Sequence, residues 1–487
     1  MTSTGRGEDT KRLASKALSK GYQLTESSIK ILLERKNPDE LLDRLLSWIK
    51  SSRPGTILIE PGVVMDFLRT IEEEKPPEEQ VAKTASFRIK STSYSDVWIE
   101  GSTEEFRLYF TVRYQRIREI FERRGISVYS PSELREQGLK EAYIIGMVSE
   151  VRPVKNGYSV VVEDPKGVWR IIVPKGDRNL EERVEDLLPD MVVTMRVRVR
   201  ASVLVAQDIL LPDVPPVPQR RLSGPDVNVC IISDIHVGSS RFNEELFNDF
   251  LEWLSSDEDE ASKTCFLVIN GDLVDGVYIY PGQENELALP SLNKQFEKAS
   301  ELLKKIPERV TVIYAPGNHE PVRKALPQPP IQHRYRELLG QHDGLVYVGN
   351  PAWISFDGIE FLVFHGQTLD DVIQSGSRFS YSTIHRDAAA LLEFVLRTRH
   401  LAPTYGVVTP LLPLRDDPLM ISEVPVVFAT GHIHVAAQSL YRGVHLVNTG
   451  TWQEQTKFQA SLGLEPTVGT AAILNLRSMR LSIKKFG

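Results

Sequence analysis

Five apolar segments of the chain each end in a short turn that carries aspartate, asparagine or histidine. These segments read "NVCIISDIH", "CFLVINGD", "VTVIYAPGNHE", "FLVFHG" and "VVFATGHIH". Their turns supply oxygen and nitrogen donors from Asp234, His236, Asp272, Asn318, His365, His432 and His434. A single such turn could hold an ordinary buried histidine. Five in one domain indicate a shared centre that binds metal.

The types of these donors limit the metals that they can hold. A mixture of imidazole, carboxylate and amide oxygen suits manganese, iron or zinc better than a magnesium site built only of oxygen. The two cysteines, Cys230 and Cys265, are too few for a thiolate site, and we expect them to pack as small apolar residues. Seven donors exceed what one ion usually takes from a protein. They fit a two-metal site, which activates water and stabilises the attacking and leaving oxygens on phosphorus.

The apolar runs before the turns predict buried strands that aim the turns at one place. Ligand sites of layered α/β folds form where loops leave strand ends, because the sheet fixes the direction of the loops. Glycine at positions 271, 317, 366 and 431 allows the backbone to leave each strand tightly. We therefore predict an α/β domain over residues 226–487.

Residues before this domain fall into several segments that differ in hydrophobic pattern and composition. Residues 1–70 are predicted to form a helical module, because Leu41, Leu42, Leu45, Leu46 and Ile49 make one apolar stripe behind Asn37 as N-cap and Pro38 as the first helical residue. Residues 71–100 are charged, contain prolines and lack a period, which predicts a flexible linker. Residues 101–138 are predicted to be a helical connector.

Residues 139–213 read as an all-β unit. Asn156-Gly157 is a strong signal for a tight turn, and the segment holds several short strands, so we expect a small barrel of the OB-fold type. Strict alternation places Arg196, Arg198 and Arg200 on one face, where they are candidates for contact with DNA. Such barrels bind single strands or dock proteins, and both roles stay open. A proline-rich linker over residues 214–225 follows.

Composition limits the function further. The chain has 487 residues, of which 41% are hydrophobic and 25% charged, as in globular proteins. Its net charge of −7 argues against a strong general affinity for nucleic acid, so we expect a partner to provide most of the affinity for DNA. Neither a signal peptide nor a membrane span is apparent, and we expect a cytoplasmic protein without contact to membranes.

The ordered motifs "SDIHVGS", "NGDLVDG", "GNHE", "FHG" and "GHIH" resemble the calcineurin-like metallophosphoesterase superfamily over about residues 226–440. This resemblance implies a layered β-sandwich with flanking helices. It further implies a division of roles. Asp234, His236 and His434 would bind one ion, Asn318, His365 and His432 the second, and Asp272 would bridge both. By the same resemblance, His319 would be the general acid, and Glu320 would orient it from outside the ligand set.

A closer resemblance covers most of the chain. "RHLAPTYGVVTPLLP", "ISEVPVVFATGHIHV" and "YRGVHLVNTGTWQEQTKFQ" are similar to the small subunits of archaeal family D DNA polymerases. This implies a 3′→5′ proofreading exonuclease that uses two divalent transition-metal ions, with manganese first and iron or zinc as alternatives. It implies a large catalytic subunit and DNA 3′ ends as partners, with a sliding clamp as a further candidate. A catalytically silent structural subunit, a repair nuclease and a phosphatase remain alternatives.

Overall fold

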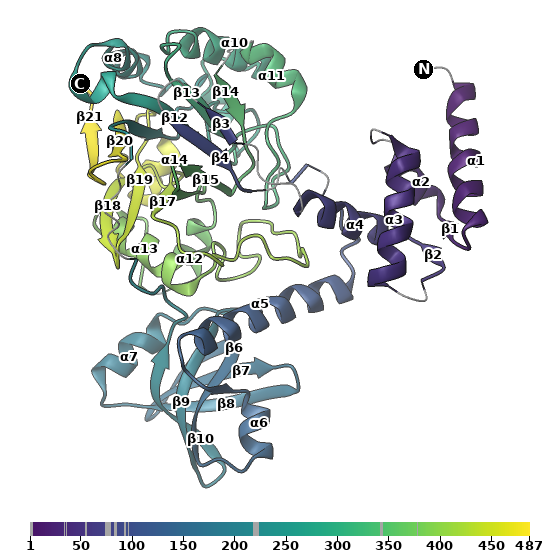
Figure 1. Cartoon of the computed structure of the whole chain (residues 1–487). Helices are drawn as coiled ribbons and strands as arrows, with labels where there is room; N and C mark the ends of the chain where they lie inside the picture. The colour runs from purple at the N-terminus through teal and green to yellow at the C-terminus, as the bar shows by residue number, and fades with distance from the viewer. Residues whose placement is uncertain are drawn as a thin grey trace. The chain divides into compact units, whose positions relative to one another are not determined.

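The computed structural model divides the chain into two compact units, Met1–Glu78 and Glu79–Gly487, and each is described by itself (Figure 1). Helices make up most of the first unit, and sheets dominate the second. The structure describes residues 3–33, 35, 37–53, 56–73, 79–81, 85–91, 94–95, 97–217, 224–340, 344–376 and 378–487. None of the helices in these ranges is long and apolar enough to cross a membrane.

The first unit is mostly helical in the region where a helical module was predicted. It contains α1 (Ser3–Ser19), α2 (Glu26–Leu33), α3 (Pro38–Ser52) and α4 (Pro61–Glu73), with the short parallel pair β1 (Gln23–Leu24) and β2 (Leu58–Ile59). The stripe of α3 packs into the core, where Leu42, Leu45 and Ile49 are at most 1% exposed. Asn37 precedes α3 as predicted, but its backbone is left-handed and its side chain caps nothing among the described residues.

Helices and a closed sheet follow in the second unit. α5 (Thr103–Arg123), β5 (Val128–Tyr129) and α6 (Pro131–Glu136) lead into β6 (Glu141–Val154), β7 (Gly157–Asp164), β8 (Gly167–Pro174), α7 (Arg178–Glu185), β9 (Val192–Arg200) and β10 (Val203–Leu210). Strand pairing runs β6-β7-β8-β10-β9, and β9 pairs with β6 again. The sheet therefore closes on itself as a five-stranded barrel in which β8 and β10 are parallel.

Two sheets form the predicted layered sandwich in the rest of the second unit. One sheet has the order β14-β13-β12-β11-β20-β21, and the other β18-β19-β17-β16-β15-β4-β3. The first contains β11 (Asn228–Ile232), β12 (Thr264–Asn270), β13 (Thr311–Ala315), β14 (Leu345–Tyr347), β20 (Thr470–Asn475) and β21 (Leu481–Lys485). The second contains β3 (Glu79–Val81), β4 (Ser86–Ile89), β15 (Ala352–Phe356), β16 (Ile359–Val363), β17 (Val427–Thr430), β18 (Ala436–Tyr441) and β19 (Val444–Thr449).

Helices cover the outer faces of both sheets, which explains the unbroken apolar runs of the strands. In β12, Phe266 and Val268 belong to the core between the sheets, while Leu267 and Ile269 pack outward under helices. The helices of this region are α8 (Glu244–Ser255), α9 (Asp259–Ser262), α10 (Leu292–Leu303), α11 (His333–Leu339), α12 (Leu369–Ser375), α13 (Ile384–Thr398) and α14 (Lys457–Leu462), with a 3₁₀ turn at Gln283–Asn285. Figure 1 shows α10 and α11 beside β13 and β14.

The prediction of a linker over residues 71–100 is wrong in part. α4 continues to Glu73, and Ser86–Ile89 forms β4, which pairs antiparallel with β15. Phe87 explains the difference: it is 3% exposed and its ring lies 5.7 Å from that of Phe266 in the core between the sheets. The few aromatic residues in this charged segment gave no period, yet Phe87 anchors a strand. Residues 74–78, 82–84, 92, 93 and 96 lie outside the described residues.

We expect Phe87→Ala to destabilise the second unit by about 3–5 kcal/mol, because it removes a fully packed ring and leaves a cavity between the sheets. Urea unfolding followed by tryptophan fluorescence would measure the change. Trp98→Ala is the matched control, since Trp98 is 55% exposed and its loss should shift the transition little. An unchanged transition for Phe87→Ala would contradict the pairing of β4.

Candidate metal centre

The structure brings all seven predicted ligands together at the carboxyl ends of five strands. β11, β12 and β13 are parallel neighbours in one sheet, and β16 and β17 are parallel neighbours in the other. Their loops meet at one edge of the sandwich. Two groups of donor atoms there each lie within 4.8 Å of one another, one from Asp234, His236 and His434 and one from Asp272, His365 and His432. Asn318 joins the second group through its Oδ1.

Tight backbone turns aim these side chains inward. Asp234, His236, Asp272, His432 and His434 all have left-handed backbones, with φ between 52° and 69°. Residues other than glycine seldom adopt this conformation, and such strain gathers at functional sites where the surroundings enforce it.

Two glycines leave room for the loops to approach one another. A Cβ atom on Gly317 would lie 2.2 Å from Oδ1 of Asp272, and one on Gly271 would lie 2.3 Å from Nδ1 of His365. Gly271 also has a φ of +87°. Any side chain at either position would displace a candidate ligand, so space requires glycine at both positions, and backbone conformation requires it at Gly271 as well.

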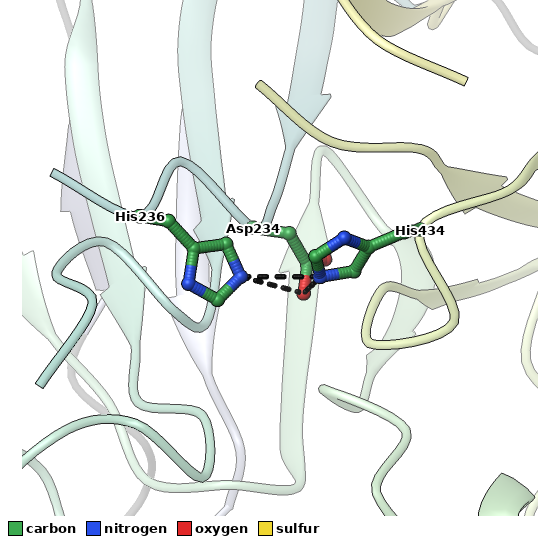
Figure 2. Close-up of side chains that lie close together, drawn as sticks. All are labelled: Asp234, His236 and His434. Carbon is green, nitrogen blue, oxygen red and sulfur yellow. Dashed lines mark hydrogen bonds and ion pairs between the residues drawn. The ribbon is translucent and has the colours of Figure 1, made fainter. Parts of the chain in front are cut away.

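The first group has the geometry of an ion site (Figure 2). Nε2 of His434 lies 3.3 Å from Oδ1 of Asp234 and 3.1 Å from Nε2 of His236. Oδ1 of Asp234 is buried and has no hydrogen-bond donor among the described residues. A buried carboxylate oxygen without a donor is costly unless a cation compensates it. This oxygen, with two imidazole nitrogens beside it, fits a divalent metal ion.

The second group surrounds Asn318. Its Oδ1 lies 2.9 Å from Nε2 of His365 and 2.9 Å from Nδ1 of His432. Nε2 of His365 also lies 3.3 Å from Oδ2 of Asp272. The same Oδ2 is 3.9 Å from Nε2 of His236 in the first group. Asp272 therefore lies between both groups, as a bridging ligand must.

Outer contacts set which nitrogen of each histidine faces the centre. Nδ1 of His236 lies 3.0 Å from Oδ1 of Asp275, and Nε2 of His432 lies 2.9 Å from Oδ2 of Asp370. Hydrogen bonds of this kind fix the tautomer and orientation of a metal-binding imidazole. The sequence analysis did not identify Asp275 or Asp370. Asp275 follows Asp272 by three residues in "GDLVDG", whereas nothing in "TLDDV" set Asp370 apart.

The buried charges of the centre oppose one another. Burial raises the pKa of Asp272, but the imidazoles of His365 and His319 outweigh it and hold this pKa well below its ordinary value. Burial lowers the pKa of His365, yet Asp272 outweighs burial and raises it to about 10. A proton on the imidazole of His365 thus balances the carboxylate of Asp272. A cation that bound here would displace that proton, so its affinity would rise with pH.

Comparison with known proteins shows to which family the chain belongs. Residues 229–437 match the family model that describes the B subunits of DNA polymerases alpha and epsilon. The DNA polymerase II small subunit of Methanothermobacter thermautotrophicus is 32% identical over 474 residues, which cover 95% of this chain and 97% of that protein. That of Archaeoglobus fulgidus is 32% identical over 96% of both chains. The chain belongs to the archaeal DNA polymerase II small-subunit family.

Some other relatives align over less of their length. The DNA polymerase II small subunit of Pyrococcus abyssi is 38% identical over 71% of this chain and 56% of its own length. Among solved structures, zinc-bound Vps29 of Entamoeba histolytica is 14% identical, covers 53% of this chain and 90% of that protein, and has a TM-score of 0.28. A score this low supports no conclusion about the small subunit.

In this small subunit, His319 lies beside both groups of ligands. Its ring centroid is 4.6 Å from that of His236, and its Nε2 is 3.8 Å from Oδ2 of Asp272. Nδ1 lies 2.7 Å from the backbone oxygen of Asp275, so the proton is on Nδ1 and Nε2 faces the centre. Burial lowers the pKa of His319 to about 4, which keeps the free imidazole neutral at pH 7.

Glu320 does not orient His319 as the resemblance implied. Its carboxylate is fully buried and accepts four hydrogen bonds, from the backbone N–H groups of Asp272, Leu273 and Gly317 and from the hydroxyl of Tyr314. Burial raises its pKa to about 7. Glu320 therefore ties the loop after β12 to the loop after β13, and the backbone oxygen of Asp275 takes over the contact with His319.

Two of the three arginines on β9, Arg196 and Arg198, are less available for DNA than their alternation suggested, whereas Arg200 is exposed. Arg196 and Arg198 both donate to the carboxylate of Glu141 on β6, with Nη2 of Arg198 at 2.8 Å. Their side chains remain about half exposed, at 48% and 46%. One carboxylate therefore offsets part of the positive charge of this face.

We expect Glu320→Gln to lower the free energy of unfolding by about 1–3 kcal/mol, because its amide group would face the N–H of Leu273, which then loses its acceptor. Urea unfolding in EDTA would measure this without metal. Glu465→Gln, at an exposed position, is the control. Equal stability of the Glu320→Gln variant and the wild type would show that the carboxylate does not hold the two loops together.

Proposed function

We propose that this chain is the 3′→5′ proofreading exonuclease of an archaeal family D DNA polymerase and hydrolyses phosphodiester bonds with two divalent transition-metal ions. Manganese is the first choice of metal, with iron or zinc as alternatives. The observation that carries the proposal is the complete set of seven ligands in two adjoining groups that share Asp272. A subunit that had lost its chemistry would have no need to keep five ligands in left-handed conformations.

The residues divide the work by position. Asp234, His236 and His434 would hold one ion, and Asn318, His365 and His432 the other. Two ions held so would activate a water and stabilise the charge that develops on the phosphate oxygens. The chain itself would supply the proton for the leaving oxygen from Nε2 of His319. A phosphate bound beside this nitrogen would raise its pKa from the low value of the free protein, since opposite charges favour the protonated form.

The proposal also assigns the remaining parts of the chain. The large catalytic subunit of the polymerase would be the partner, and DNA 3′ ends the substrate, with a sliding clamp as a further candidate. We infer that the five-stranded barrel over residues 139–213 is an OB-fold, supported by its closed strand order and by α7 between β8 and β9. Its arginines are partly neutralised by Glu141, which favours a role in docking over a strong grip on DNA.

We expect Asp272→Ala to lose both ions or nearly both, because its carboxylate lies between the two groups of donors. Metal analysis of the full chain purified with manganese would measure the ion content. Asp249→Asn, at an exposed position of α8, is the control and should keep both ions. Two ions in Asp272→Ala would exclude the bridging role.

We expect the polymerase complex to remove mismatched 3′ nucleotides faster than matched ones, because a paired terminus must first fray at a cost of a few kcal/mol.

His319→Ala should slow hydrolysis by about 10²- to 10⁴-fold and keep its metal. A time course on 5′-labelled oligonucleotides would measure both effects. His333→Ala, at an exposed position of α11, is the control.

Other outcomes would favour the alternatives. Release of the labelled 5′ nucleotide first would reverse the proposed polarity. Full metal content without any hydrolysis would favour a structural subunit. Activity on short phosphate esters alone would favour a phosphatase.

A further inference from the structure

Three aromatic side chains next to the metal centre have no use in the mechanism above. Tyr278 is 84% exposed and Phe458 is 56% exposed, and the ring of Phe458 stacks on that of Tyr280 with 6.1 Å between centroids and 22° between planes. We propose that Tyr278, Tyr280 and Phe458 form a stacking platform that binds the unpaired bases of the DNA strand whose phosphate lies at the metals. This inference rests on the proposed function.

The loop that carries Tyr278 and Tyr280 is fastened to the centre. Gly276, two residues before Tyr278, lies so close to His319 that a Cβ atom there would be 2.5 Å from the backbone oxygen of His319. At the other end of the loop, Nε2 of Gln283 donates to the backbone oxygen of Asp275 at 2.8 Å. Asp275 in turn contacts His236 and His319. The loop that carries the two tyrosines is therefore fixed at both ends to residues that contact the proposed general acid.

Phe458 comes to Tyr280 from a different part of the chain. It lies in α14, whose next residue, Gln459, has its Nε2 2.8 Å from Nδ1 of His434. The Tyr280–Phe458 pair thus spans from the loop beside His319 to the helix beside His434. An aromatic surface that connects a proposed general acid with a metal ligand borders the position where a phosphodiester would bind.

Tyr278 is held out in the solvent by its backbone. Its φ is 62°, a conformation that is a genuine outlier for a bulky residue. Exposure of the ring and strain in the backbone both cost free energy, and no packing of the ring in the core repays them. Strained, exposed residues of this kind occur where a ligand is bound. Tyrosine suits this task, because its ring gives a large contact area with few rotatable bonds.

Nucleotide bases fit these rings better than another protein surface does. Aromatic side chains beside a phosphate-binding centre stack on successive bases of a single strand, and such stacking tolerates any sequence, as proofreading requires. Positive charge for the strand backbone is near, since Nζ of Lys324 lies 2.5 Å from the backbone oxygen of the ligand Asn318. A paired terminus keeps its bases stacked in the duplex, so the platform would select frayed ends.

The test measures binding without catalysis. The full chain in EDTA is titrated into a single-stranded oligonucleotide with 2-aminopurine at its 3′ end. Fluorescence of this base is quenched when it stacks on an aromatic ring, and anisotropy of a 5′ label gives the affinity. We expect Tyr278→Ala and Phe458→Ala each to weaken binding by about 5- to 150-fold and to reduce quenching. Tyr278→Phe and Phe458→Tyr should restore both, because they keep the ring.

Controls separate this inference from the proposed function. Leu440→Ala removes an equally exposed apolar side chain, at 56%, from β18 and should change neither readout. An oligonucleotide with abasic 3′ positions should bind the wild type as weakly as the intact oligonucleotide binds the alanine variants. Equal affinity of the wild type and the alanine variants would overturn the platform even if the enzyme digests DNA. Weaker binding to the large subunit with unchanged DNA affinity would overturn it in favour of a protein contact. Quenching that depends on the rings would support the platform even in a protein without hydrolysis.

Discussion

The burial of carboxylates at the end of the sandwich is the constraint on which the centre depends. Asp234 is 0% exposed and Asp272 is 1% exposed, and a buried carboxylate is tolerated only when positive charge or hydrogen-bond donors compensate it. Imidazoles supply that charge from both sheets. His236 follows β11 in the same sheet as both carboxylates, whereas His365 and His434, which lie 3.3 Å from Asp272 and Asp234, follow strands of the other sheet. Both sheets of the sandwich therefore contribute to the electrostatics of the site.

The same constraint explains why the loops are so firmly held. If the loops were free, the backbones of the left-handed residues would relax to more common conformations. The flexible glycines, which allow the loops to come close, would also allow the loops to move apart. Glu320 prevents this through its bonds to the backbones of Asp272 and Gly317, which join the exits of β12 and β13. A carboxylate that binds backbone N–H groups fixes the position of Asp272 without competing for a metal.

Much of this fold and site could be predicted from the sequence, and the omissions have a common cause. The seven candidate ligands could be selected from the sequence because each follows an apolar strand, a local pattern that needs no knowledge of neighbours. β4 was missed because its place in the sheet depends on a pairing with β15, far away in the chain. Asp370 was missed for the same reason, since its contact with His432 joins α12 to the exit of β17. The role of Glu320 was misjudged because residue type alone does not show which groups a buried carboxylate faces.

The charge distribution relates the site to the rest of the chain. A net charge of −7, and arginines of the barrel that share Glu141, leave little long-range attraction for DNA. Contacts to phosphates release counterions and weaken steeply with salt, whereas stacking on rings does not depend on charge. A subunit built this way would hold the last bases of a strand by short-range contacts. It would discriminate best between frayed and paired ends if a partner subunit made the salt-dependent contacts to the DNA backbone. Weak overall affinity is then compatible with editing, because a firm hold on every 3′ end would bring matched termini to the metals as readily as mismatched ones.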